Sequence, residues 1–320
     1  MRRDFIIGLA VLLVTGAAAL AETYPSKSIR AIVPFGAGSA ADVIPRIVFE
    51  ELSARLGQAI IVENRGGAGG IIGTAAVAKA EPDGYTILAN STAQAITPAM
   101  YSNLSYDAAT DFAAVGAIGS VPNVLIIAPS KGIKTLAEFV AVGKAKPGSF
   151  NFASLGVGSA VHMSAERFRI AAGYEAVHIP FKGGAEALTE VMTGRVDYYF
   201  CPIATALPFI KDGKLLGLAV SSPTRSSLLP DVPTTLEQRF PDSDFTFWLG
   251  VFVPAKTPKE IVDKLNRELA AAVASPAVKE KLAAIGVETM SMTPSAFDSY
   301  VKGEIARYAT FARAAGLKPN

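Results

Sequence analysis

A five-residue pattern, Gly-x-Gly-Ser-Ala, occurs twice in the chain, at Gly36–Ala40 and again at Gly156–Ala160. Each copy follows a run typical of a buried β-strand and precedes a run with the apolar spacing of an α-helix. The first N–H groups of a helix lack intrahelical acceptors and carry partial positive charge, so each copy is a candidate anion-binding turn. Two such turns in separate halves of one chain predict a cleft that binds a small anion from both sides.

Neither turn contains a cationic side chain. Lysine and arginine are absent from residues 35–45 and 154–166. An anion bound there would contact backbone dipoles and hydroxyl groups, with Lys182, in a third glycine turn, as the nearest cationic candidate. Each helix terminus contributes ~0.3–1 kcal/mol, up to ~2 kcal/mol when partly buried. This range favours a small, releasable ligand over a tightly bound polyphosphate.

Three side chains near the turns allow two interpretations each. Asp42 and His162 occupy the same position in the two copies, so each could contact the ligand or hydrogen-bond the backbone of its own turn. Cys201, just after a predicted strand, could line the cleft or pack as a small buried hydrophobe. It is the only cysteine, so no intramolecular disulfide can form.

The first 21 residues have the pattern of a secretory signal peptide. A basic start, Met1–Asp4, precedes the apolar run Phe5–Leu20 and the small-residue cleavage site Ala19–Ala21. The apolar run is too short to favour a membrane span, and no cysteine near the cleavage site could carry a lipid anchor. We therefore expect export to the periplasm and cleavage after Ala21.

The remaining chain is nearly neutral. Without residues 1–21, which carry two arginines and one aspartate, 28 of the 30 basic and 27 of the 28 acidic residues remain. This balance does not indicate nucleic acid or an anionic membrane surface as a partner. The remaining length of about 300 residues suits two domains of ordinary size.

Strand and helix signals alternate along most of the chain, which predicts an α/β fold with largely parallel sheets and ligands at the strand carboxyl ends. Strands are predicted at residues 29–35, 59–63, 85–89, 124–128, 150–155, 176–180, 196–200, 215–221 and 245–253. Helices are predicted after both Gly-x-Gly-Ser-Ala turns and at residues 134–145, 185–192, 258–274, 276–285 and 294–315.

A dinucleotide-binding oxidoreductase is one alternative. Gly36–Ala41 fits G-x-G-x-x-A after a strand, and Glu63 ends the next predicted strand, where a ribose-binding acid would lie. This interpretation leaves the second Gly-x-Gly-Ser-Ala copy unexplained, and soluble nicotinamide cofactors are scarce outside the cytoplasm. We therefore expect no cofactor.

An exported hydrolase is the other enzymatic alternative. No G-x-S-x-G occurs, and the S-x-x-K match, Ser299–Lys302, lies in an amphipathic C-terminal pattern. The two histidines, His162 and His178, cannot supply a His-rich metal site, and neither H-E-x-x-H nor C-x-x-C occurs. No pattern assembles a nucleophile, a base and an orienting group. We expect a binding protein without catalytic activity or a bound metal.

Short segments, in order along the mature chain, carry a resemblance to a known family. They are Tyr24–Arg30, Val33–Phe35, Val62–Arg65, Gly67–Gly70, Pro82–Tyr85, Asn151–Ser154, Leu229–Thr234 and Pro254–Pro258. On these segments the chain resembles the Bug-type (TctC family) extracytoplasmic solute receptors of tripartite tricarboxylate transporters.

The resemblance implies a type II periplasmic-binding-protein-like fold, with two Rossmann-like α/β lobes around a cleft, joined by two crossing strands. We place the crossings near Val121–Val124 and Ser221–Arg225. Lobe 1 would then comprise residues 22–122 plus 226–320, and lobe 2 residues 123–225. The resemblance further implies a monomer that captures a small organic acid, partly through water, and delivers it to membrane permease subunits.

The chain departs from the family pattern at two places. Ala41 stands where members usually carry threonine, and Cys201-Pro202 stands where they often carry Asp-Asn. The carboxylate end of the site therefore resembles the family, whereas the far end is less polar and does not identify the ligand. The expected ligand-binding residues are Phe35, Gly36, Ala37, Gly38, Ser39, Ala40, Asp42, Asn90, Ser91, Ser154, Gly156, Gly158, Ser159, His162, Lys182 and Cys201.

Overall fold

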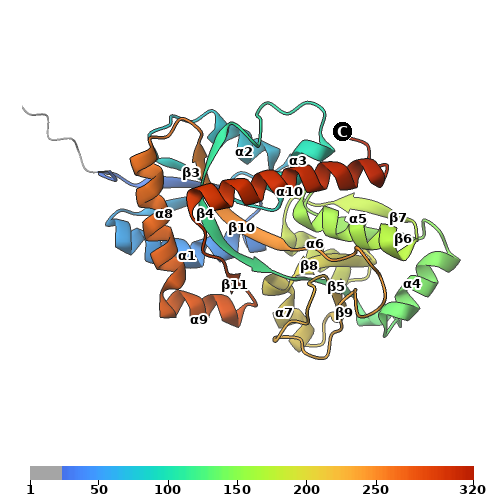
Figure 1. The fold of residues 1–320 in the computed structure, drawn as a ribbon. Coiled ribbons are helices and arrows are strands. Elements are labelled where there is room, and N and C mark those ends of the chain that lie inside the picture. Colours follow the sequence, from blue (N-terminus) through green and yellow to red (C-terminus); the bar gives the residue numbers. More distant parts are fainter. Residues whose placement is uncertain (1–23) are drawn as a thin grey trace, which may run out of the picture.

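Two α/β lobes, each built on its own β-sheet, lie side by side and are joined by segments that run between the sheets (Figure 1). The computed structural model describes residues 24–320, so the predicted signal peptide at residues 1–21 lies outside the described part. The two sheets, with helices packed on them, confirm the predicted α/β class.

The first lobe contains a six-stranded sheet in the order β11-β4-β10-β3-β1-β2. β1, β2 and β3 are parallel, whereas β10 runs antiparallel to both β3 and β4. The strands are β1 (Ile29–Val33), β2 (Ile60–Asn64), β3 (Thr86–Ser91), β4 (Phe112–Val121), β10 (Phe247–Pro254) and β11 (Glu288–Thr289). The helices are α1 (Ala40–Leu56), η1 (Ala68–Gly70), α2 (Ile71–Ala78), α3 (Ala93–Met100), α8 (Lys259–Ala274), α9 (Pro276–Ala284) and α10 (Pro294–Ala314).

The second lobe contains a five-stranded sheet in the order β7-β6-β8-β5-β9. β6, β7 and β8 are parallel, and β5 is antiparallel to β8 and β9. The strands are β5 (Asn123–Ile127), β6 (Phe150–Ser154), β7 (Ala176–Pro180), β8 (Tyr198–Pro202) and β9 (Leu216–Val220). The helices are η2 (Pro129–Lys131), α4 (Leu136–Ala145), α5 (Ala160–Ala172), α6 (Gly184–Met192) and α7 (Ile203–Lys211).

The two Gly-x-Gly-Ser-Ala turns occupy equivalent places in the two lobes. β1 leads into α1 and β6 leads into α5, and Ser39 and Ser159 have the extended backbone of N-cap residues. Pro45 lies inside α1, which nevertheless continues from Ala40 to Leu56 as one helix. Both turns therefore lie at the carboxyl end of a parallel strand, where α/β sheets present ligand sites.

The chain first passes between the lobes at Pro122, which separates β4 of one sheet from β5 of the other. In Figure 1, α10 extends from the first lobe across to the second, beside α5. Two aromatic side chains of α10 make contacts along this path. The Arg167 guanidinium of α5 lies 5.1 Å from the Phe311 ring centroid, and the ring centroids of Phe245 and Tyr308 lie 6.2 Å apart. The last helix therefore contacts both the second lobe and a segment that joins the lobes.

The chain returns to the first lobe later in the sequence than the expected crossing near Ser221–Arg225. Thr234 forms a parallel bridge with Val220, the Thr235 N–H donates to the Val220 carbonyl, and Phe240 packs in the second lobe's core. Because β9 is the last strand of its sheet, this segment supplies hydrogen bonds that the sheet edge would otherwise lack. The chain re-enters the first sheet at Phe247. We propose lobe boundaries at residues 24–122 plus 245–320 and 123–244.

Candidate ligand-binding site

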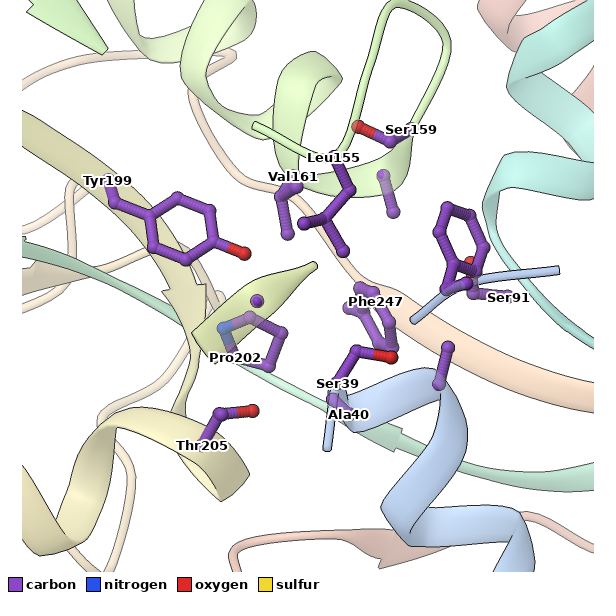
Figure 2. A pocket seen from close by; sticks show the side chains of 14 residues that line it. Ser39, Ala40, Ser91, Leu155, Ser159, Val161, Tyr199, Pro202, Thr205 and Phe247 are labelled. Carbon is purple, nitrogen blue, oxygen red and sulfur yellow. The ribbon is translucent and has the colours of Figure 1, made fainter. Parts of the chain in front are cut away.

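A small pocket lies where the N-termini of α1 and α5 meet (Figure 2). The first lobe lines it with Phe35, Ser39, Ala40, Ala41, Ser91 and Phe247. The second lobe contributes Ser159, Ala160 and Val161 from its turn, together with Leu155, Gly184, Tyr199, Pro202 and Thr205. No charged side chain occurs among these lining residues.

The serine of the first turn presents an unused hydroxyl to this pocket. Ser39 is buried, and its Oγ has no hydrogen-bond partner among residues 24–320. Its carbonyl, not its hydroxyl, accepts the N–H groups of Asp42 and Val43, each at 2.9 Å. A buried hydroxyl without a partner costs ~1–3 kcal/mol, which a ligand acceptor could recover.

The serine of the second turn acts as a true cap. The Ser159 Oγ accepts the His162 N–H at 3.3 Å and donates to the Gly156 carbonyl at 2.7 Å. The two copies of one sequence pattern therefore differ: the Ser159 hydroxyl stabilises its own turn, whereas the Ser39 hydroxyl is available to a ligand.

Asp42 lies behind the first turn and does not line the pocket. One carboxylate oxygen accepts the Gly38 N–H at 2.9 Å, and the other accepts Arg46 Nε and Asn64 Nδ2, each at 2.8 Å. Of its two sequence interpretations, the structure therefore favours bonding to its own turn. Asp42 therefore positions the backbone of the first turn.

A histidine pair lies behind the second turn. The Ser154 Oγ accepts the Gly156 N–H at 3.0 Å and bonds His178 Nε2, and the His178 ring centroid lies 4.3 Å from that of His162. Burial lowers the pKa of both histidines to about 4, with Arg169 adding to the effect on His162. Both rings are therefore neutral at pH 7, and neither lines the pocket.

The remaining eight expected residues lie outside the pocket or act indirectly. Lys182 is exposed and, with Gly156, lines a neighbouring surface hollow that shares Phe35 with the pocket. Asn90 accepts the Ser91 N–H at 2.8 Å and donates to Gln94, so it supports a lining residue. Cys201 is buried in the core, where burial raises its thiol pKa. The turn residues Gly36, Ala37, Gly38 and Gly158 form the loops without lining the pocket.

Several lining residues were not anticipated from the sequence. Tyr199 lies in a predicted strand, directly before Phe200, which packs in the core of the second lobe. Because side chains alternate between the two faces of a strand, the sequence could have indicated that Tyr199 faces the opposite side of the sheet. Thr205 lies in α7, a helix that was not predicted, at its third position. Figure 2 shows the Tyr199 and Thr205 hydroxyls directed into the pocket. The remaining unanticipated residues are Ala41, Leu155, Ala160, Val161, Gly184, Pro202 and Phe247.

The lobes touch next to the pocket. The Tyr101 hydroxyl donates to the Val157 carbonyl at 3.1 Å, across the two lobes. A Cβ on Gly69 would lie 1.9 Å from the same carbonyl, so only glycine permits this approach. The glycine-rich run near Gly69 thus packs against the second turn.

Two negative findings concern residues 24–320. No group of three or more histidine, cysteine, aspartate or glutamate side chains in this range could hold a metal ion. No helix within the same range is both long and apolar enough to cross a membrane.

A pocket between two α/β lobes, lined by helix N-termini and hydroxyl groups, defines a two-lobe solute-binding protein. Solved structures support this class. The periplasmic binding protein BugD has a TM-score of 0.90 at 32% identity, covering 93% of this chain and 100% of that chain. An R. palustris protein, Rpa4515 with adipate, has a TM-score of 0.89 at 32% identity, covering 93% and 100%. MatC from Rhodopseudomonas palustris, with bound malate, has a TM-score of 0.86 at 29% identity, covering 90% and 99%.

Residues 44–317 match the family model described as the tripartite tricarboxylate transporter family receptor, so this chain belongs to the TctC family. Protein BugT of Bordetella pertussis is 36% identical over 300 residues, which are 93% of this chain and 92% of BugT. The resemblance seen in the sequence is confirmed, and the chain is a solute-binding receptor of the periplasmic type. These relatives give no support to a hydrolase or a dinucleotide-binding enzyme.

Proposed function

We propose that this protein captures a small carboxylate-containing solute in the pocket between its lobes and delivers it to the permease subunits of a tripartite tricarboxylate-type transporter. One observation carries the proposal: the N-termini of α1 and α5, from different lobes, line one pocket that has no charged side chain. The adipate and malate in two structural neighbours are both carboxylates, which supports the same ligand class.

The donors of the pocket suit a single carboxylate group. Its two oxygens offer about four lone-pair positions. The N–H groups of the first two residues of each helix, Ala40 and Ala41 in α1 and Ala160 and Val161 in α5, lack intrahelical acceptors and, with the partnerless Ser39 hydroxyl, can occupy these positions. Binding from both lobes favours a hinge closure around the solute, because one lobe alone would leave half of the carboxylate in water.

The rest of the proposal concerns how the receptor works in the cell. The protein acts as a monomer, without catalysis, cofactor or nucleic acid. The near balance of 28 basic and 27 acidic residues beyond residue 21 supports the absence of a nucleic-acid role. Export follows cleavage after Ala21, and mass spectrometry of the native protein should find an N-terminus at or near Glu22.

A thermal-shift screen tests the ligand class. The screen contains mono-, di- and tricarboxylates and aromatic acids, each with the matching amide or alcohol as a control. A bound solute at a hundredfold excess over its Kd stabilises the folded state by ~2.7 kcal/mol. We expect stabilisation by acids and none by their uncharged controls. Equal stabilisation by acids and controls would contradict carboxylate capture.

A further inference from the structure

Tyr199 carries a hydroxyl without a protein partner at the wall of the pocket. Its side chain is 1% exposed, and its Oη makes no hydrogen bond with any residue in the described part of the chain. Figure 2 shows this hydroxyl directed into the pocket from β8. Burial raises the pKa of Tyr199 well above its usual value, so the group stays a neutral hydroxyl. The hydroxyl is therefore free to hydrogen-bond a ligand atom in the pocket.

The surroundings of Tyr199 do not suit a second negative charge. Leu155, Val161 and Pro202 give this side of the pocket an apolar wall. Lys182, the nearest cation expected from the sequence, is exposed and lines a different hollow. A carboxylate desolvated here would lack a counter-charge, which is costly in a buried site.

The nearby N-terminus of α7 is a weaker anion site than those of α1 and α5. Its N-cap, Pro202, has no N–H, and the Ile203 N–H already donates to the Pro122 carbonyl at 3.0 Å. The polar side chains that line this side of the pocket are the hydroxyls of Tyr199 and Thr205, which an uncharged oxygen can match.

We infer that Tyr199 sets the ligand specificity of the pocket by hydrogen-bonding a hydroxyl group on the ligand tail. The preferred solute is then a hydroxymonocarboxylate: its carboxylate binds the N-termini of α1 and α5, and its hydroxyl binds Tyr199. This inference rests on the proposed function. It separates this chain from its neighbours that hold adipate and malate, each of which has two carboxylates.

Calorimetry with matched acids tests the inference. Each set, from four to six carbons, contains the unsubstituted acid, the acid with a terminal hydroxyl and the dicarboxylate; 6-hydroxyhexanoate, hexanoate and adipate form one set. In the best-binding set we expect the hydroxy acid to bind at least tenfold tighter than both others, a difference of about 1.4 kcal/mol.

Two variants assign the effect to one hydroxyl. Tyr199→Phe should weaken the hydroxy acid at least tenfold and change the unsubstituted acid less than twofold. Tyr198→Phe is the matched control, since Tyr198 packs on Phe139 and Phe152 in the core of the second lobe, away from the pocket. It should leave all affinities unchanged.

The outcomes distinguish this inference from the proposed function. A dicarboxylate that binds tightest would overturn the specificity inference and leave carboxylate capture intact. Equal losses for all acids in Tyr199→Phe, or no loss, would show that Tyr199 has only a structural role. If no acid in any set binds, carboxylate capture itself fails and the inference falls with it.

Discussion

At the scale of single residues, identical positions in the two turns have different roles. Ser39 and Ser159 share one sequence pattern, yet only Ser159 caps its helix through the side chain. The difference arises in the third position of each helix: Asp42 bonds Gly38, whereas the His162 N–H bonds the serine. A carboxylate that holds the first turn leaves its serine available for the solute.

Alanine substitutions at the two serines should separate these roles. Ser39→Ala should weaken carboxylate binding about tenfold or more, because hydrogen bonds to charged groups are worth ~1.5–3 kcal/mol. It should not lower the free energy of unfolding of the ligand-free protein and should raise it, because it removes a buried hydroxyl without a partner. Ser159→Ala should lower the free energy of unfolding by ~0.5–2 kcal/mol, the usual cost of losing an N-cap. Urea denaturation and calorimetry measure both. A Ser39→Ala variant that is destabilised but binds normally would show that Ser39 is a cap after all.

The histidine pair makes stability depend on pH. Both His162 and His178 have pKa values lowered from 6.5 to about 4, so the unfolded chain binds more protons between these values. Stability is therefore full above pH 6.5 and is lost as the pH falls toward 4. For His162 the loss between pH 7.5 and 5 is on the order of 2 kcal/mol.

Urea denaturation at pH 7.5, 6 and 5 checks this expectation. His162→Gln serves as the comparison, because glutamine cannot titrate in this range. The variant should lose less unfolding free energy than the parent over the same pH interval. Parallel pH profiles of the unfolding free energy in the two proteins would mean that His162 does not contribute to the pH dependence of stability.

At the scale of elements, the two glycine turns require positive backbone φ angles that other residues rarely adopt. Gly38 and Gly158 both have φ of +77°, and a Cβ at Gly158 would also meet the Tyr101 ring at 3.2 Å. Gly148 has φ of +72°, open space around it and no contact with the pocket, so it is a matched position elsewhere in the second lobe. The strain of a branched residue is similar at Gly38 and Gly148.

Valine at each of these glycines tests whether both turns act on one ligand. Gly38→Val and Gly158→Val should each lose at least a hundredfold in affinity, about 2.7 kcal/mol, while circular dichroism shows a folded protein. Gly148→Val should bind normally at a similar stability cost. Normal binding by Gly158→Val would make the second turn structural and the two-sided site wrong.

At the scale of the whole molecule, the lobes are in contact beside the pocket. The Tyr101–Val157 hydrogen bond joins them, and the Gly69 region packs on the second turn. If the lobes close around the solute as we propose, we expect this bond to form only in the closed state and so to favour ligand binding.

Tyr101→Phe should therefore weaken ligand binding about three- to tenfold, the usual net value of one hydrogen bond. Tyr24→Phe is the matched control, because the Tyr24 hydroxyl donates to the Gly84 carbonyl at 2.8 Å within one lobe. Calorimetry gives the affinities, and small-angle X-ray scattering should show a smaller ligand-induced contraction in Tyr101→Phe alone. Indistinguishable behaviour of the two variants would argue against a role in closure.

Much of the fold was predictable because its signals are local. The strand at 176–180 and the helix beginning at 276 have the predicted bounds, since β-branched runs and N-cap residues act through near neighbours. β4 was missed because glycine, alanine and serine dominate it, and its strand form depends on pairing with β10 and β11. α7 was missed because prolines lie at its N-cap and inside it.

The sequence by itself determined the family and the two glycine turns, and predicted a carboxylate as the ligand, because a glycine turn before a helix exposes N–H groups whatever surrounds it. Only the tertiary structure decided which side chains complete the pocket. Tyr199 and Thr205 reach it, whereas Lys182 and Cys201 do not. The reason is physical: the far side of the pocket exists only where two separately folded lobes meet, and no local pattern specifies how they pack.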